Sequence, residues 1–253
     1  MVNGLEVFRQ NFLNFSEQFT IIGGTACSIL FDEVNLEFRT THDIDIVLIA
    51  EALNDSFAHK FWDFIAEGGY EIQEKSSGTP QFYRFSRPSS EKFPKMIELF
   101  SRIPDGIKLQ KDNQFTPIHI SDDISSLSAI LLDDEYYNFL RSGRDVVDGL
   151  SVLTGAYLVP FKMKAWLDLT DRKTRGQSID SKDIKKHRND VFRIVSLISV
   201  NERIEVSRTV KVDIDAFLNK MADETIDLKS LGIQSRTLDS IIELYTNLYV
   251  CEN

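Results

Sequence analysis

The sequence predicts an α+β protein, in which an N-terminal mixed sheet with flanking helices is followed by a C-terminal helical domain. Two observations favour this class. Up to about residue 155, helical patterns alternate with short segments rich in β-branched and aromatic residues, whereas every strong pattern after Leu158 has helical spacing. No linker rich in Pro, Gly or Ser separates the two parts. We therefore expect domains at 1–155 and 156–253 that share an interface.

The composition is that of a globular protein. Hydrophobic residues make up 42% of the 253 residues and charged residues 27%. The N-terminus lacks the basic start and apolar run of a signal peptide, and no apolar stretch reaches the ~20 residues that cross a bilayer. Cys27 and Cys251 are the only cysteines, and they have no metal-type spacing. The sequence thus predicts a soluble, cytoplasmic protein with no membrane partner.

Alternating helical and strand patterns fill the first domain. Leu5, Phe8, Phe12 and Phe15 recur at the spacing of one helical face, which predicts a helix over 5–17. The patterns that follow predict a strand at 20–22, a helix at 25–31, a polar loop at 35–41, a strand at 44–49, a helix at 56–67, strands at 71–74, 81–86 and 95–101, a helix near Ser125 and a strand at 149–153. Helices are expected in the second domain at 158–171, 181–199, 213–222 and 235–249.

Two aspartates, Asp43 and Asp45, stand two residues apart in the strand expected at 44–49. Side chains two apart on a strand point to the same side, so Ile44 and Ile46 would face the core. Two adjacent carboxylates repel unless a proton or a cation lies between them. A divalent ion such as Mg²⁺ or Mn²⁺ removes this repulsion, and Mg²⁺ also binds substrate phosphates. The alternative is a strand start with two solvated acids.

The turn Gly23-Gly24-Thr25 joins a buried strand to a helix. Such a turn offers free N–H groups at the positive end of a helix, which suits a phosphate. Gly24 would let the phosphate approach the backbone, and Thr25 would add a hydroxyl donor. We therefore interpret Gly23, Gly24 and Thr25 as nucleotide-binding residues; the alternative is a simple tight turn.

Taken together, the strand, Gly-Gly-Thr turn, helix and strand-borne Asp-x-Asp resemble the polymerase β-like nucleotidyltransferase superfamily. The resemblance implies that Asp43 and Asp45 bind metal and that a third acid on a neighbouring strand completes the site. Glu98 is the candidate, because it shares a strand face with Met96 and Phe100, an unusual place for a merely solvated acid. The alternative is an edge-strand charge paired with Lys95, Arg84 or Arg102.

A narrower resemblance covers roughly residues 20–50 and 155–195. The segments IIGGTACSILF, RTTHDIDIVL, LVPFKMKAW and SKDI are similar to motifs of the AbiEii/AbiGii toxin family. This resemblance implies that Lys162 is an active-site lysine, with Lys164 as a competitor, and that Asp183 completes the site. Without it, Lys162 could be a surface lysine and Asp183 an acid that favours the helix N-terminus beside a capping Asp180.

The charge distribution bears on the acceptor. The net charge is −10, yet residues 162–193 hold ten Lys or Arg and five Asp or Glu. A basic segment in an acidic protein can bind a polyanion, although it can also be a solvated helix face. We expect a metal-dependent nucleotidyltransferase that moves a nucleoside monophosphate from an NTP to RNA. The resemblance implies a toxin of a toxin–antitoxin or phage-defence pair, with an antitoxin protein as partner. The alternatives are an antibiotic-type nucleotidyltransferase and a non-catalytic scaffold that binds nucleotide or a partner protein.

Overall fold

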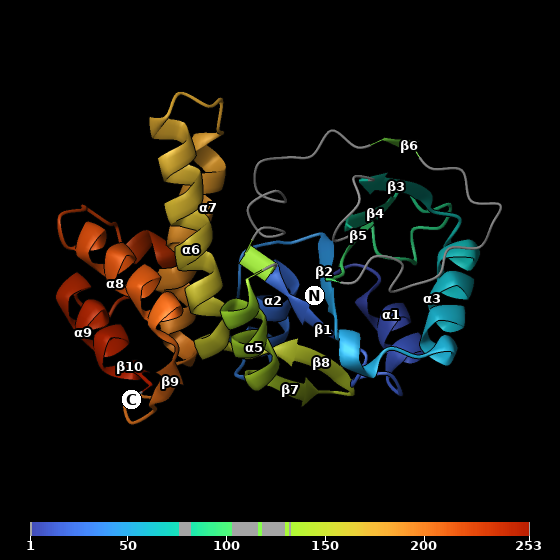
Figure 1. The fold of residues 1–253 in the computed structure, drawn as a ribbon, viewed down its shortest axis with the longest axis horizontal. Coiled ribbons are helices and arrows are strands. Elements are labelled where there is room, and N and C mark those ends of the chain that lie inside the picture. The colour runs from blue at the N-terminus through green and yellow to red at the C-terminus, as the bar shows by residue number, and fades with distance from the viewer. Residues whose placement is uncertain (1, 76–81, 103–115, 118–129, 132, 253) are drawn as a thin grey trace. The chain divides into compact units, whose positions relative to one another are not determined.

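The computed structural model describes residues 2–75, 82–102, 116–117, 130–131 and 133–252. The chain forms two compact units, Met1–His119 with Gly143–Thr154, and Ile120–Ser142 with Gly155–Asn253. The α+β prediction is confirmed, because a mixed sheet with helices builds the first unit and helices dominate the second (Figure 1). Gln81 and the helix expected near Ser125 lie outside the described residues. No helix among the described residues is long and apolar enough to cross a membrane.

The first unit is built on an eight-stranded sheet with the order β6-β3-β4-β5-β2-β1-β8-β7. Its strands are β1 (Phe19–Ile22), β2 (Asp43–Leu48), β3 (Glu71–Lys75), β4 (Phe82–Ser86), β5 (Met96–Phe100), β6 (Thr116–Pro117), β7 (Arg144–Val147) and β8 (Leu150–Leu153). β2 lies in the interior of the sheet, antiparallel to β1 and parallel to β5. The acids of β2 are therefore flanked by a strand on each side.

In the described part of the first unit the helices are α1 (Leu5–Phe12), α2 (Gly23–Glu33) and α3 (Asp55–Gly68), and a short 3-10 turn, η1 (Ala50–Ala52), precedes α3. The side chain of Asn54 accepts a hydrogen bond from Phe57 N and caps α3, and Gly69 ends it with φ of 60°. α1 is shorter than expected, but Phe15 beyond its end still packs on Phe57, with ring centroids 5.7 Å apart.

Phenylalanine rings form the core between α1, α3 and the sheet. Phe8 and Phe12 of α1 stack 4.5 Å apart, and Phe12 lies 5.2 Å from Phe64 of α3. Phe19 of β1 lies 6.2 Å from Phe12 and 6.1 Å from Phe57. Each of these five rings is at least 99% buried, and full burial of one such side chain contributes roughly 1.5–3 kcal/mol. This core fixes β1, the strand that leads into the Gly23-Gly24 turn.

The second unit consists mainly of helices, with one small parallel pair of strands. From residue 133 onward its elements are α5 (Asp134–Ser142), α6 (Gly155–Thr174), α7 (Ser181–Ile194), η2 (Val195–Leu197), β9 (Ile204–Val206), α8 (Arg208–Ala222), η3 (Lys229–Leu231), α9 (Leu238–Leu248) and β10 (Tyr249–Cys251). α6 packs against α7 and α8, and α8 packs against α9 (Figure 1). Ser207 caps α8, which therefore begins earlier than its apolar spacing predicted.

A proline inside α6 is compensated by a distant tyrosine. Pro160 has no N–H, so the carbonyl of Ala156, four residues earlier, lacks its helical partner. The hydroxyl of Tyr249, which is fully buried, donates a hydrogen bond to that carbonyl. The C-terminal strand β10 is thereby tied to the first turns of α6, the helix that carries Lys162.

Candidate active site

The turn between β1 and α2 has no room for side chains. Gly23 has φ of 69°, and a Cβ there would lie 1.9 Å from Oδ2 of Asp45. A Cβ on Gly24 would lie 2.7 Å from Oγ1 of Thr41. Position 23 therefore requires glycine for its backbone conformation, and a side chain at position 24 would have to displace Thr41.

Thr25 joins the start of α2 to the start of β2. Its side chain is fully buried, and its hydroxyl donates a hydrogen bond of 2.6 Å to the carbonyl oxygen of Asp43. The phosphate contact expected of this hydroxyl therefore competes with the bond to Asp43. The bond holds the acid-bearing strand beside the glycine turn.

Asp43 and Asp45 occupy the partly exposed side of β2. Both are half-buried, whereas Ile44 and Ile46 between and after them are buried, with at most 1% exposed. This is the alternation expected from the sequence. Ile22, the residue before the turn, pairs with Asp45 across β1 and β2. The turn and the two acids are therefore neighbours in the sheet.

Glu98 is the direct neighbour of Asp45 on the next strand. The two residues are register partners in the parallel pair β2 and β5, and their carboxyl groups share a hydrogen bond. On the other side, Nε and Nη2 of Arg84 donate to Oε1 of Glu98 at 3.0 and 2.8 Å. Of the partners that the sequence left open for Glu98, the structure selects Arg84.

The electrostatics of Glu98 reflect this crowding. Its side chain is 10% exposed, and burial raises the pKa of the carboxyl above its ordinary value. The charge of Arg84 and the hydrogen bonds from Arg84 and Asp45 oppose this rise, while the charge of Asp43 adds to it. Arg84, Glu98 and Asp45 therefore form one electrostatically linked row across β4, β5 and β2.

Some of the carboxylates in the candidate site are suitable ligands for a hard divalent cation. Asp43 and Asp45 supply two carboxylates on one side of a strand, which is the number that Mg²⁺ takes together with substrate phosphates. Oε1 of Glu98 is engaged by Arg84. Within the described residues, no group of three or more His, Cys, Asp or Glu is arranged to hold a metal ion. The fit therefore rests on the aspartate pair.

Lys162 belongs to the second unit and forms a buried ion pair. Its side chain is 7% exposed, and Nζ lies 3.0 Å from Oδ2 of Asp190, which is fully buried on α7. Arg193 lies 3.5 Å from the other oxygen of Asp190. Asp190 could not be predicted from the sequence, because a pair separated by 28 residues forms only when α6 packs on α7.

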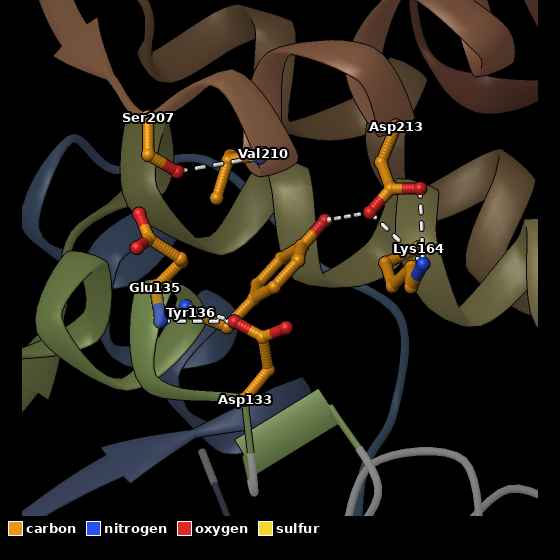
Figure 2. A network of polar contacts seen from close by, with 7 residues as sticks. All are labelled: Asp133, Glu135, Tyr136, Lys164, Ser207, Val210 and Asp213. Atoms are coloured by element: carbon orange, nitrogen blue, oxygen red, sulfur yellow. Dashed lines mark hydrogen bonds and ion pairs between the residues drawn. The ribbon is translucent and has the colours of Figure 1, made fainter. Parts of the chain in front are cut away.

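Lys164 has a more accessible position in a different network. Nζ lies 2.9 Å from both oxygens of Asp213 on α8, and the hydroxyl of Tyr136 donates to Oδ2 of Asp213 at 3.0 Å (Figure 2). Asp133 accepts hydrogen bonds from the first backbone N–H groups of α5 and so fixes the helix that carries Tyr136. The side chain of Lys164 is 35% exposed, so it retains access to solvent.

Asp183 lies in the first turn of α7 and is half-buried. Asp180 is the cap of this helix, since its side chain accepts from Lys182 N at 2.8 Å. The negative charge of Asp183 is therefore stabilised by the positive end of the helix dipole. Asp43, Asp45 and Glu98 are brought together in the first unit, and Lys162, Lys164 and Asp183 lie in the second.

No model of a protein family matches the sequence, and no curated protein matches it. Among solved structures, an antigenic nucleotidyltransferase-like protein from Paracoccidioides brasiliensis is similar, with 15% identity, 94% of this chain and 93% of that chain covered, and a TM-score of 0.40. A mutant Cid1 poly(U) polymerase bound to MgATP has 11% identity, 97% and 64% coverage, and a TM-score of 0.30.

A cytoplasmic RNA terminal U-transferase has 11% identity, 95% and 60% coverage, and a TM-score of 0.29. The chain thus spans less than two thirds of the length of the poly(U) polymerase and of the U-transferase. All three structures are nucleotidyltransferases or are described as like one.

Proposed function

We propose that the protein is a metal-dependent nucleotidyltransferase that transfers a nucleoside monophosphate from an NTP to an acceptor. The observation that carries the proposal is the position of Asp45. Its carboxylate lies over Gly23 at the start of α2, on the same side of β2 as Asp43. A pair of acids for a cation and a helix N-terminus for a phosphate therefore adjoin one another.

Each residue of this site has a distinct part. The glycines leave room for Asp45 and Thr41 beside the start of α2, where the positive end of the helix dipole favours a phosphate. Thr25 holds β2 to this turn through the carbonyl of Asp43. Asp43 and Asp45 would hold Mg²⁺ or Mn²⁺, with Glu98 beside them as the third acid. When bound, the cation supplies charge for the acceptor oxygen and the departing pyrophosphate.

The second unit contributes a cation and an acid in this proposal. The resemblance of LVPFKMKAW and SKDI to the AbiEii/AbiGii toxin family supports Lys162 and Asp183 for these parts. A lysine acts as a point charge on a phosphoryl group whose charge grows during transfer. Lys164 is the alternative, because it is more exposed than Lys162.

RNA is the proposed acceptor, and a toxin of a toxin–antitoxin or phage-defence pair in the cytoplasm is the proposed biological role. The support for RNA is a group of exposed cations at one end of α6 and the facing end of α7, namely Lys173, Arg175, Lys182, Lys185 and Lys186. Phosphate contacts from such residues supply affinity without sequence preference. The support for the toxin role and for an antitoxin partner is the motif resemblance alone.

The test is a labelling experiment. The pure protein is incubated with Mg²⁺, each α-labelled NTP in turn and total cellular RNA, and the label is followed into RNA and the release of pyrophosphate is measured. Label in RNA together with pyrophosphate supports the proposal. Label in a small cationic acceptor would instead favour an antibiotic-type nucleotidyltransferase.

A non-catalytic scaffold is the second candidate. The observation that favours it is the engagement of two expected site residues inside the protein, Glu98 with Arg84 and Lys162 with Asp190. A scaffold that binds nucleotide would be stabilised by MgNTP, by about 2.7 kcal/mol at 100 times the dissociation constant, yet would release no pyrophosphate. The two measurements together separate the candidates.

A further inference from the structure

A hollow of about 220 Å³ lies in the first unit between α1, the C-terminal end of α2 and the turn that joins β7 to β8. Its apolar lining consists of Leu5, Ile29 and Val147, each at most 6% exposed. Pockets for drug-sized ligands measure about 300–1,000 Å³, so this hollow suits one long side chain rather than a nucleotide. Gly23 and Glu33 begin and end α2, so about 15 Å of helix separate Glu33 from the glycine turn.

The charged part of the lining consists of four acids and one arginine, which are Glu6, Arg9, Asp32, Glu33 and Asp148. The guanidinium group of Arg9 lies 2.7 Å from Oε2 of Glu6 and 3.7 Å from Oδ2 of Asp148, so these two acids share one cation. The carboxylates of Asp32 and Glu33 make no hydrogen bond or ion pair with any residue that the structure describes. The hollow therefore has an excess of negative charge on the side of α2.

The place of Asp32 and Glu33 on α2 adds to this excess. Both lie in the last turn of the helix, where the helix dipole is negative, and that turn contains no basic residue. Both side chains are exposed. A cation that enters the hollow is therefore attracted by the two carboxylates and by the helix end together.

An exposed leucine adjoins the turn that borders the hollow. The side chain of Leu13, the residue after α1, is 47% exposed, and its Cβ lies 3.3 Å from the position of an ideal Cβ on Gly149. Gly149 follows Asp148 in the turn between β7 and β8. Apolar groups beside a polar rim are the usual composition of a protein–protein interface.

We propose that this hollow binds an arginine side chain from a basic segment of a partner protein. The apolar stem of the arginine packs on the buried lining, and its planar guanidinium group pairs with Asp32 and Glu33. Arginine is enriched among the side chains that dominate the affinity of protein interfaces. This interaction does not depend on the proposed nucleotidyltransferase function, because none of these residues belongs to the proposed active site.

NMR titration of the whole protein tests the proposal with three probes: acetyl-Leu-Arg-Leu-amide, the same peptide with glutamine in place of arginine, and spermidine. The arginine peptide should shift the amide signals of Leu5, Ile29 and Val147. The glutamine peptide should bind about tenfold more weakly or worse, because it lacks the charge-assisted hydrogen bonds. Asp32→Asn combined with Glu33→Gln should weaken the arginine peptide by a similar factor of about ten.

Asp63→Asn combined with Glu67→Gln is the matched control, since both are exposed acids of α3 in the same unit and the change in net charge is the same. This control should bind the arginine peptide as tightly as wild type does. Melting curves check that both double variants are folded, and both should transfer at the wild-type rate.

Three results would overturn the proposal. Equal weakening in the control variant would show that net charge alone attracts the peptide. Absence of shifts at the hollow with millimolar arginine peptide, or equal binding of the glutamine peptide, would show that no arginine is recognised. Tighter binding of spermidine than of the arginine peptide would assign the hollow to a free polyamine rather than to a partner protein.

Discussion

The carboxylate of Asp45 takes the space that a side chain at Gly23 would occupy, with Oδ2 1.9 Å from the position of an ideal Cβ. Because Gly23 directly follows β1 and Asp45 lies on β2, the contact depends on the antiparallel register of the two strands. Position 23 sets the backbone conformation of the turn, and it also sets where the acid of the proposed site can lie.

Gly23→Ala should reduce both stability and transfer. A non-glycine residue at φ of 69° costs about 1–2 kcal/mol, and the methyl group must also displace Asp45. Gly176→Ala is the matched control, because Gly176 has φ of 88° and nothing within 4 Å of an ideal Cβ. Urea unfolding and transfer rates check both variants. Equal stability losses and full transfer activity in Gly23→Ala would mean that the contact with Asp45 is unimportant.

Lys162→Met should be strongly destabilising. It removes the lysine that lies 3.0 Å from the buried Asp190 and leaves Arg193 at 3.5 Å, and breaking a buried pair costs about 3–5 kcal/mol. Lys162→Met with Asp190→Asn should recover much of this stability. Lys164→Met should cost at most about 1 kcal/mol, because that pair is partly exposed.

The same variants decide which lysine serves the reaction. If Lys162 acts on the phosphate, the double variant is folded but transfers slowly, and Lys164→Met stays active. The reverse pattern assigns the part to Lys164. Transfer at the wild-type rate in both proteins would remove a lysine from the proposed site.

Charge reversal at the exposed end of α6 and α7 should weaken RNA binding and leave NTP binding unchanged. With Lys173, Arg175, Lys185 and Lys186 changed to Glu, the slope of log affinity against log salt should fall by about 3 for single-stranded RNA. Reversal of the exposed residues Lys92, Arg208, Lys220 and Lys229 gives the same net charge and serves as the control. Filter binding over a salt titration measures the slope. An equal loss in the control would point to net charge rather than to this surface.

Tyr249→Phe should lower stability at neutral pH, and its effect should shrink in alkali. The variant leaves the carbonyl of Ala156 without a partner, at a cost of about 1–3 kcal/mol. Burial raises the pKa of the Tyr249 hydroxyl well above its ordinary value, so the folded state keeps this proton while the unfolded chain loses it. Wild-type stability should therefore fall from about pH 10 upward, by about 1.4 kcal/mol per pH unit for this group.

Tyr249→Phe has no hydroxyl at this position and so does not show this loss of stability above pH 10. The other buried tyrosines lower the stability of wild type and variant equally. Urea unfolding of wild type and Tyr249→Phe at pH 7, 10 and 11 measures the difference. A constant difference across this range would contradict the account.

Local patterns predicted the elements that carry the site. The alternation of Asp43, Ile44, Asp45 and Ile46 predicted a half-buried strand, and Asp180 was expected to cap α7. These features depend on neighbours along the chain. The helix boundaries differed where capping and packing override apolar spacing, as at Ser207, which starts α8 before its first predicted turn.

Features that depend on distant partners could not be predicted. The choice of Arg84 for Glu98 follows from the register of β4 and β5, and the burial of Lys162 against Asp190 follows from the packing of α6 on α7. The segment 35–41 was expected only to be a polar loop. Its return over Gly24, which brings Arg39 to the turn, depends on Phe38 packing on α2.

The most direct test of the central claim is the rate of transfer from an α-labelled NTP by Asp43→Asn and Asp45→Asn. Each variant removes one carboxylate from the half-buried side of β2, and cation stabilisation is worth several kcal/mol, so we expect a fall of about 100-fold or more. Asp63→Asn, an exposed acid on α3, is the control and should transfer at the wild-type rate. Circular dichroism and melting curves should show that all three variants are folded. Wild-type transfer by both Asp43→Asn and Asp45→Asn would contradict the assignment of the active site to this strand.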